Sequence, residues 1–377
     1  MASANQETGS AGITPLFNPV RLGSIDLANR MAVAPMTRVS ATADGVPTAD
    51  MVDYYRAFAE GGFGLIISEG IYTDKAYAQG YINQPGLTDP RQRAGWAQVV
   101  DQVHRAGGRV IAQLMHAGGL SQGNPHREGS VAPSSLQPKG AQLSIYRGDG
   151  DYCVPREMSL AEIEEARQGF VSAAVMARAA GFDGVEIHGA NGYLLDQFLT
   201  EGVNCRSDDY GGSVAVRARL LTEVLSAVQA AVGVEFTVGV RLSQAKVNDF
   251  QHRWSGEAEA EIVFRAAAAA GADYIHTTEF EAWRPAFEGG HATFAELARI
   301  ASGLPIVANG GLHNVDKAVA VIASGATVVS IGRGALANAD WPARIAGGGE
   351  ILPFNPDLLY PVADLANSRR VRSANFS

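Results

Sequence analysis

Cysteine is scarce in this sequence, and long apolar runs are missing from it. Cys153 and Cys205 are the two cysteines among 377 residues, too few for a disulfide scaffold or for the four thiolates that usually hold an iron–sulfur cluster. No stretch of about 18 apolar residues is available to span a membrane. The first eleven residues are small and polar, without the basic and apolar regions of a signal peptide. We therefore expect a cytoplasmic protein in which residues 1–12 are disordered.

Positive charge is also in short supply. The net charge of -9 argues against nucleic acid or another polyanion as a general partner. Of the four lysines, only Lys246 falls near a predicted strand end, on the loop beyond it, which weighs against a Schiff-base aldolase. With 46% hydrophobic and 18% charged residues, the composition is typical of a globular protein with a substantial core. We expect one domain over residues 1–377, possible assembly into a homo-oligomer, and small-molecule ligands.

Short apolar runs alternate with helical patterns from Met31 onward. Eight such units in about 300 residues predict a (β/α)₈ TIM barrel, because the rival doubly wound sheet needs fewer strands and no closure. The predicted strands are Met31–Ala34, Gly64–Ser68, Arg109–Leu114, Gly184–His188, Phe236–Leu242, Tyr274–Thr277, Pro305–Ala308 and Val328–Ile331. The predicted helices are Asp50–Glu60, Gln92–Arg105, Ser159–Ala180, Val216–Ala231, Gly256–Ala270, Thr293–Ser302 and Val315–Ser324. Ser159 and Glu162 form a capping-box pattern at the start of the clearest helix.

Two segments fall outside this alternation. In Leu16–Leu27, two short apolar pieces flank Gly23-Ser24, which predicts a β-hairpin that plugs the N-terminal end of the barrel. The stretch His116–Glu157 after the third strand is rich in glycine, proline and serine. Because excursions of this length are usually functional, we expect residues 117–157 to form a lid-like insertion over the active site.

The hexad His188-Gly189-Ala190-Asn191-Gly192-Tyr193 follows the fourth predicted strand, where a barrel of this type carries its chemistry. If the chain turns helically there, His188 and Asn191 share one face. Two hydrogen-bonding groups beside a phenol suggest substrate polarisation together with proton donation. The same residues are also common in plain turns, so the hexad alone leaves both interpretations open.

Other strand ends carry groups that suit a flat heterocycle. Thr37 follows a stiff proline turn after the first strand, and Gly70 after the second lets a ring approach the backbone closely. Gln113 on the third strand can donate and accept at once, which suits a pyrimidine edge. Alternation along the fifth strand directs Arg241 into the barrel mouth. A buried guanidinium needs a partner, either the interior Glu186 or a ligand that becomes anionic.

The loops after strands seven and eight predict a phosphate site. Asn309-Gly310-Gly311 and Gly332-Arg333 each lead into a helix, at the two loops where TIM barrels commonly bind phosphate. Glycines expose backbone N–H groups, and Arg333 adds a bidentate donor. A phosphate, an amide and an arginine around one mouth describe a flat heterocycle with a phosphorylated tail, most simply FMN.

The chain resembles the Old Yellow Enzyme family of FMN-dependent ene-reductases from roughly Pro15 to Ala346. The matching segments are Leu16-Phe17 through Asn29-Arg30, Ala34-Pro35-Met36-Thr37-Arg38, Gln113-Leu114-Met115-His116, the hexad with its continuation Leu194-Leu195-Asp196-Gln197-Phe198, Asn204–Ser213, and Ile331-Gly332-Arg333. The resemblance implies tightly but non-covalently bound FMN and NAD(P)H as reductant. It also implies hydride transfer from reduced FMN to the β-carbon of an activated alkene such as an enone, enal, maleimide or nitroalkene.

The resemblance further assigns residues to roles. His188 and Asn191 would bind the carbonyl or nitro oxygen, and Tyr193 would protonate the α-carbon. The isoalloxazine would be held by Pro35, Met36, Thr37, Gly70, Gln113 and Arg241, and the phosphate by the glycine loops with Asn309, Gly310, Gly311, Gly332 and Arg333.

Met115 stands where many relatives have tryptophan, which should widen one side of the substrate pocket. Gln244 stands where many have proline, so the loop Lys246–Trp254 and the segment Glu281–Phe287 can shape the pocket differently.

Two rival functions compete with that of an ene-reductase. A metal-dependent hydrolase draws on His116, His188 and His276, which all fall at strand ends. Against it, no His-x-His opens the first strand and no aspartate ends the eighth, so no metal ligands are assigned. A non-catalytic flavin-binding protein has no need for the phenol of Tyr193. The sequence does not place the region beyond Ala346, which can cover its own barrel or reach a neighbour.

Overall fold

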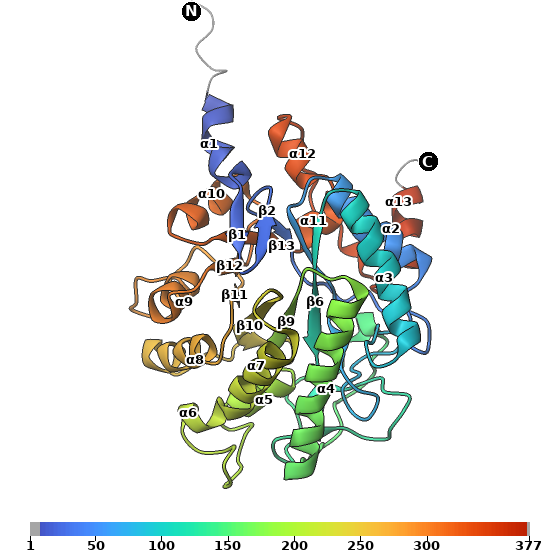
Figure 1. Cartoon of the computed structure of the whole chain (residues 1–377), viewed down its shortest axis with the longest axis vertical. Coiled ribbons are helices and arrows are strands. Elements are labelled where there is room, and N and C mark those ends of the chain that lie inside the picture. Colours follow the sequence, from blue (N-terminus) through green and yellow to red (C-terminus); the bar gives the residue numbers. More distant parts are fainter. Residues whose placement is uncertain (1–7, 375–377) are drawn as a thin grey trace, which may run out of the picture.

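The computed structural model describes residues 8–374, and within them a closed parallel barrel forms the centre (Figure 1). Strand β3 pairs with β13 on one side and with β4 on the other, and β4 in turn pairs with β6, so that the sheet closes on itself. The barrel strands are β3 (Met31–Val33), β4 (Leu65–Ile67), β6 (Arg109–Met115), β9 (Gly184–Asn191), β10 (Thr237–Lys246), β11 (Tyr274–Thr278), β12 (Ile306–Asn309) and β13 (Val328–Ile331). The predicted TIM barrel is confirmed.

Helices follow the strands and cover the barrel from outside (Figure 1). They are α2 (Ala49–Glu60), α3 (Pro90–Arg105), α4 (Leu160–Ala180), α5 (Leu194–Leu199), α6 (Val214–Arg217), α7 (Arg219–Val232), α8 (Glu257–Ala269), α9 (Phe294–Ser302), α10 (Val315–Ala323), α11 (Arg333–Ala337), α12 (Trp341–Ala346) and α13 (Leu365–Ala374). The capping box of Ser159 and Glu162 starts α4 as predicted. The helix predicted over 216–231 is present but not continuous, because the chain breaks at Ala218 into α6 and α7.

The hairpin plug is present at the N-terminal end of the barrel. β1 (Val20–Leu22) and β2 (Ile25–Leu27) pair antiparallel. Their buried side chains pack against a cluster of apolar residues from the barrel strands, namely Ala32, Leu65, Ile67, Ile111, Tyr274, Val307 and Val328. Of the segment expected to be disordered, residues 1–7 lie outside the described part, whereas residues 8–12 belong to helix α1 (Thr8–Phe17). For residues 8–12, that expectation is corrected.

The excursion between β6 and α4 holds little regular structure. It contains the 3₁₀ turns Gly118–Leu120 and Ser144–Tyr146 and the short parallel pair β7 (Val131–Ala132) and β8 (Arg156–Glu157). The C-terminal segment lies against it, since the Ala363 N–H donates to the Ile145 carbonyl at 2.9 Å. The region beyond residue 346 therefore folds over its own barrel. Among residues 8–374, no helix has both the length and the apolar character needed to cross a membrane.

Candidate active site

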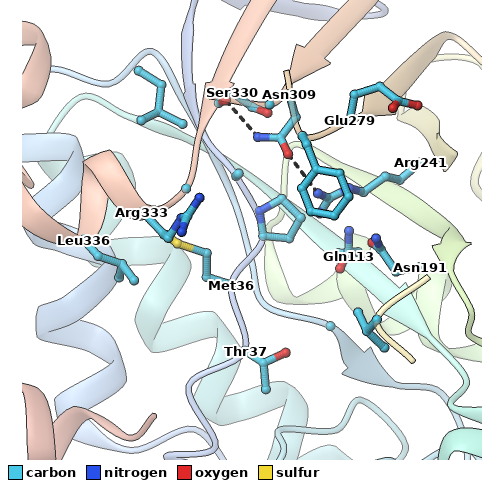
Figure 2. Close-up of a pocket in the computed structure, with 18 of the residues that line it drawn as sticks. Met36, Thr37, Gln113, Asn191, Arg241, Glu279, Asn309, Ser330, Arg333 and Leu336 are labelled. Carbon is cyan, nitrogen blue, oxygen red and sulfur yellow. Dashed lines mark hydrogen bonds between the residues drawn. The ribbon is translucent and has the colours of Figure 1, made fainter. Parts of the chain in front are cut away.

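One cavity of about 440 Å³ opens at the carboxyl ends of the barrel strands (Figure 2). Ligand pockets in proteins usually measure about 300–1,000 Å³. Every site residue predicted from the sequence lines it: Pro35, Met36, Thr37, Gly70, Gln113, Met115, His188, Asn191, Tyr193, Arg241, Asn309, Gly310, Gly311, Gly332 and Arg333. The fold thus brings together groups from seven strand ends, because parallel strands in a barrel all end at one rim.

His188 is a neutral hydrogen-bond donor in this cavity. Burial, and then the positive charge of Arg241, lower the pKa of its imidazole to about 3. The Ala190 N–H donates to His188 Nδ1 at 3.3 Å, so the ring proton sits on Nε2. That N–H is left to donate to a ligand oxygen.

Asn191 reaches the cavity by a different route from the one predicted. Strand β9 continues through Asn191 instead of turning helically after His188, so the helical spacing is wrong. Pairing between β9 and β10 shifts register between Leu242 and Lys246, and Asn191 adopts φ +62°, a conformation that asparagine tolerates well. With this bulge and left-handed conformation, Asn191 lines the same cavity as His188.

The turn after Asn191 is held by buried side chains. Asp196 accepts the Gly192 N–H at 2.6 Å, and Gln197 donates to the Gly192 carbonyl at 2.7 Å. The other oxygen of Asp196 pairs with Lys246 Nζ at 2.5 Å, and both side chains are buried. Lys246 was expected on a loop beyond the strand; it is instead the last residue of β10, and its partner belongs to α5.

Tyr193 shares its hydroxyl with a second tyrosine. Its oxygen lies 2.5 Å from the hydroxyl of Tyr81, and both rings are buried. Burial raises the pKa of Tyr193, so the phenol keeps its proton at neutral pH. The ring of Tyr81 lies 4.7 Å from that of Tyr146 (centroid to centroid), a cavity-lining residue whose hydroxyl bonds to Thr37.

Arg241 lacks the carboxylate partner that the sequence offered. Its Nη2 bonds to Thr278 Oγ1 at 3.2 Å and to Asn309 Oδ1 at 3.3 Å (Figure 2), and its buried Nε has no hydrogen-bond partner. Glu186 instead accepts from Gln113 Nε2 at 2.8 Å. With its nitrogen engaged there, Gln113 keeps Oε1 as the acceptor for a ligand. A buried cation with an unpaired N–H fits an electron-rich ligand edge.

The two glycine loops pack closely around the other end of the cavity. Gly310 and Gly311 have φ of +139° and +66°, and a Cβ on Gly311 would lie 2.8 Å from the Trp283 ring. Gly334, the second residue of α11, would place a Cβ 2.4 Å from that of His313. These loops therefore require glycine for both conformation and space. Arg333 beside them is exposed and its guanidinium lies over the Phe354 ring.

Gly70 lies under Met115 rather than under open space. A Cβ on Gly70 would come within 2.6 Å of Met115 Sδ, so the glycine makes room for this side chain. Of the aromatic residues in the two segments noted from the sequence, Trp283 packs beneath Lys317, and Phe287 lines a separate surface cavity.

Several cavity residues were not named individually from the sequence, although Tyr146 and Phe250 lie in the two segments, 117–157 and Lys246–Trp254, that were expected to shape the site. Tyr146 comes from the excursion after β6, Phe250 and Phe280 from the loops after β10 and β11, and Glu279 from the end of β11. Burial raises the pKa of Glu279 to about 7. Alternation and glycine motifs do not identify such loop residues. Among these residues, Glu279 alone had a usable signal, because it is a polar residue directly after β11.

The three strand-end histidines have separate partners. His276 bonds to Glu186 and Ser330 at 2.8 Å each, and His116 Nδ1 accepts the Gly118 N–H. Within residues 8–374, no three histidine, cysteine, aspartate or glutamate side chains converge in a way that could hold a metal ion.

Comparison with known proteins identifies the family. The model of the NADH:flavin oxidoreductase / NADH oxidase family matches residues 15–350. The chain belongs to this family. A probable flavin mononucleotide-dependent alkene reductase of Leishmania infantum is 33% identical over 369 residues, 94% of this chain and 96% of that protein.

Solved structures of the family agree. The old yellow enzyme homologue from Zymomonas mobilis is similar with a TM-score of 0.83 and 33% identity, over 92% of this chain and 96% of that one. The structure of morphinone reductase in complex with tetrahydroNAD is similar with a TM-score of 0.81 and 34% identity, over 91% of this chain and 93% of that one. The resemblance to the Old Yellow Enzyme family is confirmed: the chain is an FMN- and NAD(P)H-dependent oxidoreductase acting on carbon–carbon double bonds.

The cavity of this family member fits FMN. The unpaired Nε of Arg241 and the free oxygen of Gln113 offer a donor and an acceptor to the pyrimidine half of the ring. The other end of the cavity offers the backbone N–H groups and the cation that a phosphate needs, from Gly310, Gly311, Gly332 and Arg333.

Proposed function

We propose that this chain reduces enones, enals, maleimides and nitroalkenes, with His188 and Asn191 binding the activating oxygen and Tyr193 protonating the α-carbon. The observation that carries the proposal is the grouping of three side chains in one cavity: a neutral Nε2–H donor, a carboxamide and a protonated phenol. They line the same cavity as Gln113 and Arg241, which fit the flavin.

Each of these residues has a role that follows from its chemistry. FMN held by these residues would supply hydride chemistry, with a nicotinamide as the source of the electrons. As negative charge grows on the substrate oxygen, the donors of His188 and Asn191 stabilise it, and one such donor contributes about 2.7–4 kcal/mol in comparable sites. Tyr193 donates its proton to the substrate carbon, and Tyr81, 2.5 Å away, donates to the phenolate oxygen that remains.

We also propose that nicotinamide and alkene use this cavity in turn. No Gly-x-Gly-x-x-Gly loop follows a strand in the sequence, which supports a site for the reductant within this cavity. Morphinone reductase, with a structure of similar shape, has been solved with tetrahydroNAD. Residues 117–157 contribute Leu143, Ile145 and Tyr146 to the cavity wall, which supports a role as a lid that excludes water.

The variant Tyr193→Phe tests the proton-donor assignment. In rapid-mixing experiments we expect flavin reduction by nicotinamide to keep its rate, while reoxidation by cyclohexenone slows by about 10²–10⁴-fold, the usual contribution of a general acid. Tyr152→Phe is the matched control, because the Tyr152 hydroxyl is also buried but has no hydrogen-bond partner. Equal reoxidation rates in Tyr193→Phe and the parent protein would rule out Tyr193 as the acid.

A further inference from the structure

A buried polar network lies deeper in the barrel than the cavity and touches it at two points. The network consists of Gln113, Glu186, Tyr274, His276 and Ser330. Gln113 and Ser330 line the cavity, whereas the other three side chains are fully buried. Nothing in the proposed reaction uses those three.

Glu186 is the centre of the network. Its Oε1 accepts from Gln113 Nε2 at 2.8 Å, and its Oε2 accepts from the Tyr274 hydroxyl at 2.9 Å and from His276 Nδ1 at 2.8 Å. On its other side, His276 Nε2 lies 2.8 Å from Ser330 Oγ. The chain of contacts therefore runs from one cavity residue, through the carboxylate, to another.

Strand register explains how these groups meet. Gln113 on β6 lies opposite Glu186 on β9, and Gly239 on β10 is the next partner in the sheet. A Cβ on Gly239 would lie 2.0 Å from the Tyr274 ring. Because this position has no side chain, Tyr274 can reach across β10 from β11 to the carboxylate.

The network contains one formal negative charge. Burial by itself would raise the pKa of Glu186, but the hydrogen bond from His276, the charge of Arg241 and the hydrogen bond from Gln113 hold it below its ordinary value. Burial lowers the pKa of His276, so the neutral ring donates through Nδ1 and accepts the Ser330 hydroxyl through Nε2. A carboxylate thus lies close to Arg241 without an ion pair between them.

We propose that Glu186 is a positioning residue that lowers the reduction potential of bound FMN. It acts in two ways on residues that face the ring. By engaging Gln113 Nε2, it directs Oε1 of that amide to the cavity as an acceptor. Its charge also offsets part of the positive field of Arg241, so that negative charge gained by the ring on reduction is stabilised less.

The variant Glu186→Gln tests this in the FMN-loaded protein. It removes the charge and keeps the shape. We expect reduced FMN to be favoured over oxidised FMN by at least about tenfold, which for a two-electron couple is about 30 mV more positive. A redox-dye titration at pH 6 measures the potential. The dissociation constant of oxidised FMN, measured in parallel, shows whether the site remains intact.

Glu69→Gln is the matched control. Glu69 is also fully buried, bonds to the Tyr55 hydroxyl, and does not line the cavity. Burial raises its pKa to about 7, so at pH 6 this substitution removes little charge and should leave the potential unchanged. A Glu186→Gln protein that binds FMN with an unchanged or more negative potential would overturn the proposal.

Tyr274→Phe provides a second test that does not depend on Glu186→Gln folding. It removes one hydrogen bond from the carboxylate and leaves the charge in place. The less compensated charge should favour oxidised FMN by about threefold, the opposite direction from Glu186→Gln. A potential that stays unchanged or rises would contradict the proposal, because loss of a purely structural contact has no reason to give this sign.

Discussion

Replacing Lys246 by methionine should destabilise the protein through Asp196. The substitution keeps the apolar stem and removes the ammonium that lies 2.5 Å from Asp196 Oδ1. Asp196 is fully buried, so the carboxylate then lacks its cation. Removing one partner of a buried ion pair costs about 3–5 kcal/mol. Unfolding entropy is about 2.1 cal/mol/K per residue, so for a chain of 377 residues this corresponds to a melting temperature about 4–6 °C lower.

The loss should depend on pH. Burial already raises the pKa of Asp196 in the folded protein above its ordinary value, even beside Lys246. Without the ammonium it rises further, so the folded variant takes up a proton that the unfolded chain does not bind. Proton uptake of this kind stabilises the folded state as pH falls. The deficit relative to the parent protein is therefore largest at pH 8 and smaller at pH 5.5.

Thermal unfolding of the FMN-loaded proteins by circular dichroism measures the effect. Lys317→Met is the control, since Lys317 is exposed and contacts the Trp283 ring, and we expect a change of at most about 0.5 kcal/mol. Adding Asp196→Asn to Lys246→Met should restore part of the stability, because a neutral amide can still accept the Gly192 N–H. A Lys246→Met protein as stable as the parent at pH 8, or a double variant less stable than Lys246→Met, would refute the reasoning.

Two further substitutions test individual contacts of the site. Tyr81→Phe keeps the ring against Tyr146 but removes the hydroxyl beside Tyr193. Because one hydrogen bond is worth about 1 kcal/mol, we expect about fivefold slower flavin reoxidation by cyclohexenone, and no further slowing in a Tyr193→Phe background. Equal slowing in both backgrounds would show that Tyr81 does not act through Tyr193. Arg333→Ala should raise the dissociation constant of FMN by about 10–100-fold, the range for a hydrogen bond to a charged group. Fluorescence of FMN released on dilution measures it, and unchanged retention would mean that the backbone N–H groups suffice.

The cavity was predictable from the sequence because the carboxyl ends of all strands in a parallel barrel lie at one rim. Residues at the carboxyl end of any barrel strand must lie at the same rim, so Gln113, Arg241 and Gly332 could be grouped without knowledge of their contacts. Their hydrogen bonds were not predictable in the same way. The sequence suggested Glu186 as the partner of Arg241. In the structure, the Glu186 carboxylate accepts hydrogen bonds from Gln113, Tyr274 and His276, and Arg241 donates to Asn309 instead.

The missed residues share a physical reason. Tyr81 lies in the irregular stretch between β5 (Ile71–Tyr72) and α3, where no periodicity indicates which side chains turn inward. Its role depends on one contact with a residue 112 positions away. Lys246 was misplaced because the bulge in β10 extends the strand four residues beyond the alternating pattern that ended at Leu242. Such distant pairings and bulges are decided by tertiary packing rather than local preference.

Arg38 links the loop after β3 to the C-terminal segment of the chain. It follows Thr37 on the cavity wall, and its buried guanidinium donates to the carbonyls of Ala363 and Asp364 and to the Ser368 hydroxyl. Leu359 from the same C-terminal segment lines the cavity. A chain that ends before residue 359 would therefore lack part of the cavity wall and also the hydrogen-bond partners of Arg38. FMN binding should therefore depend on the contacts that residues 359–368 make with the loop after β3.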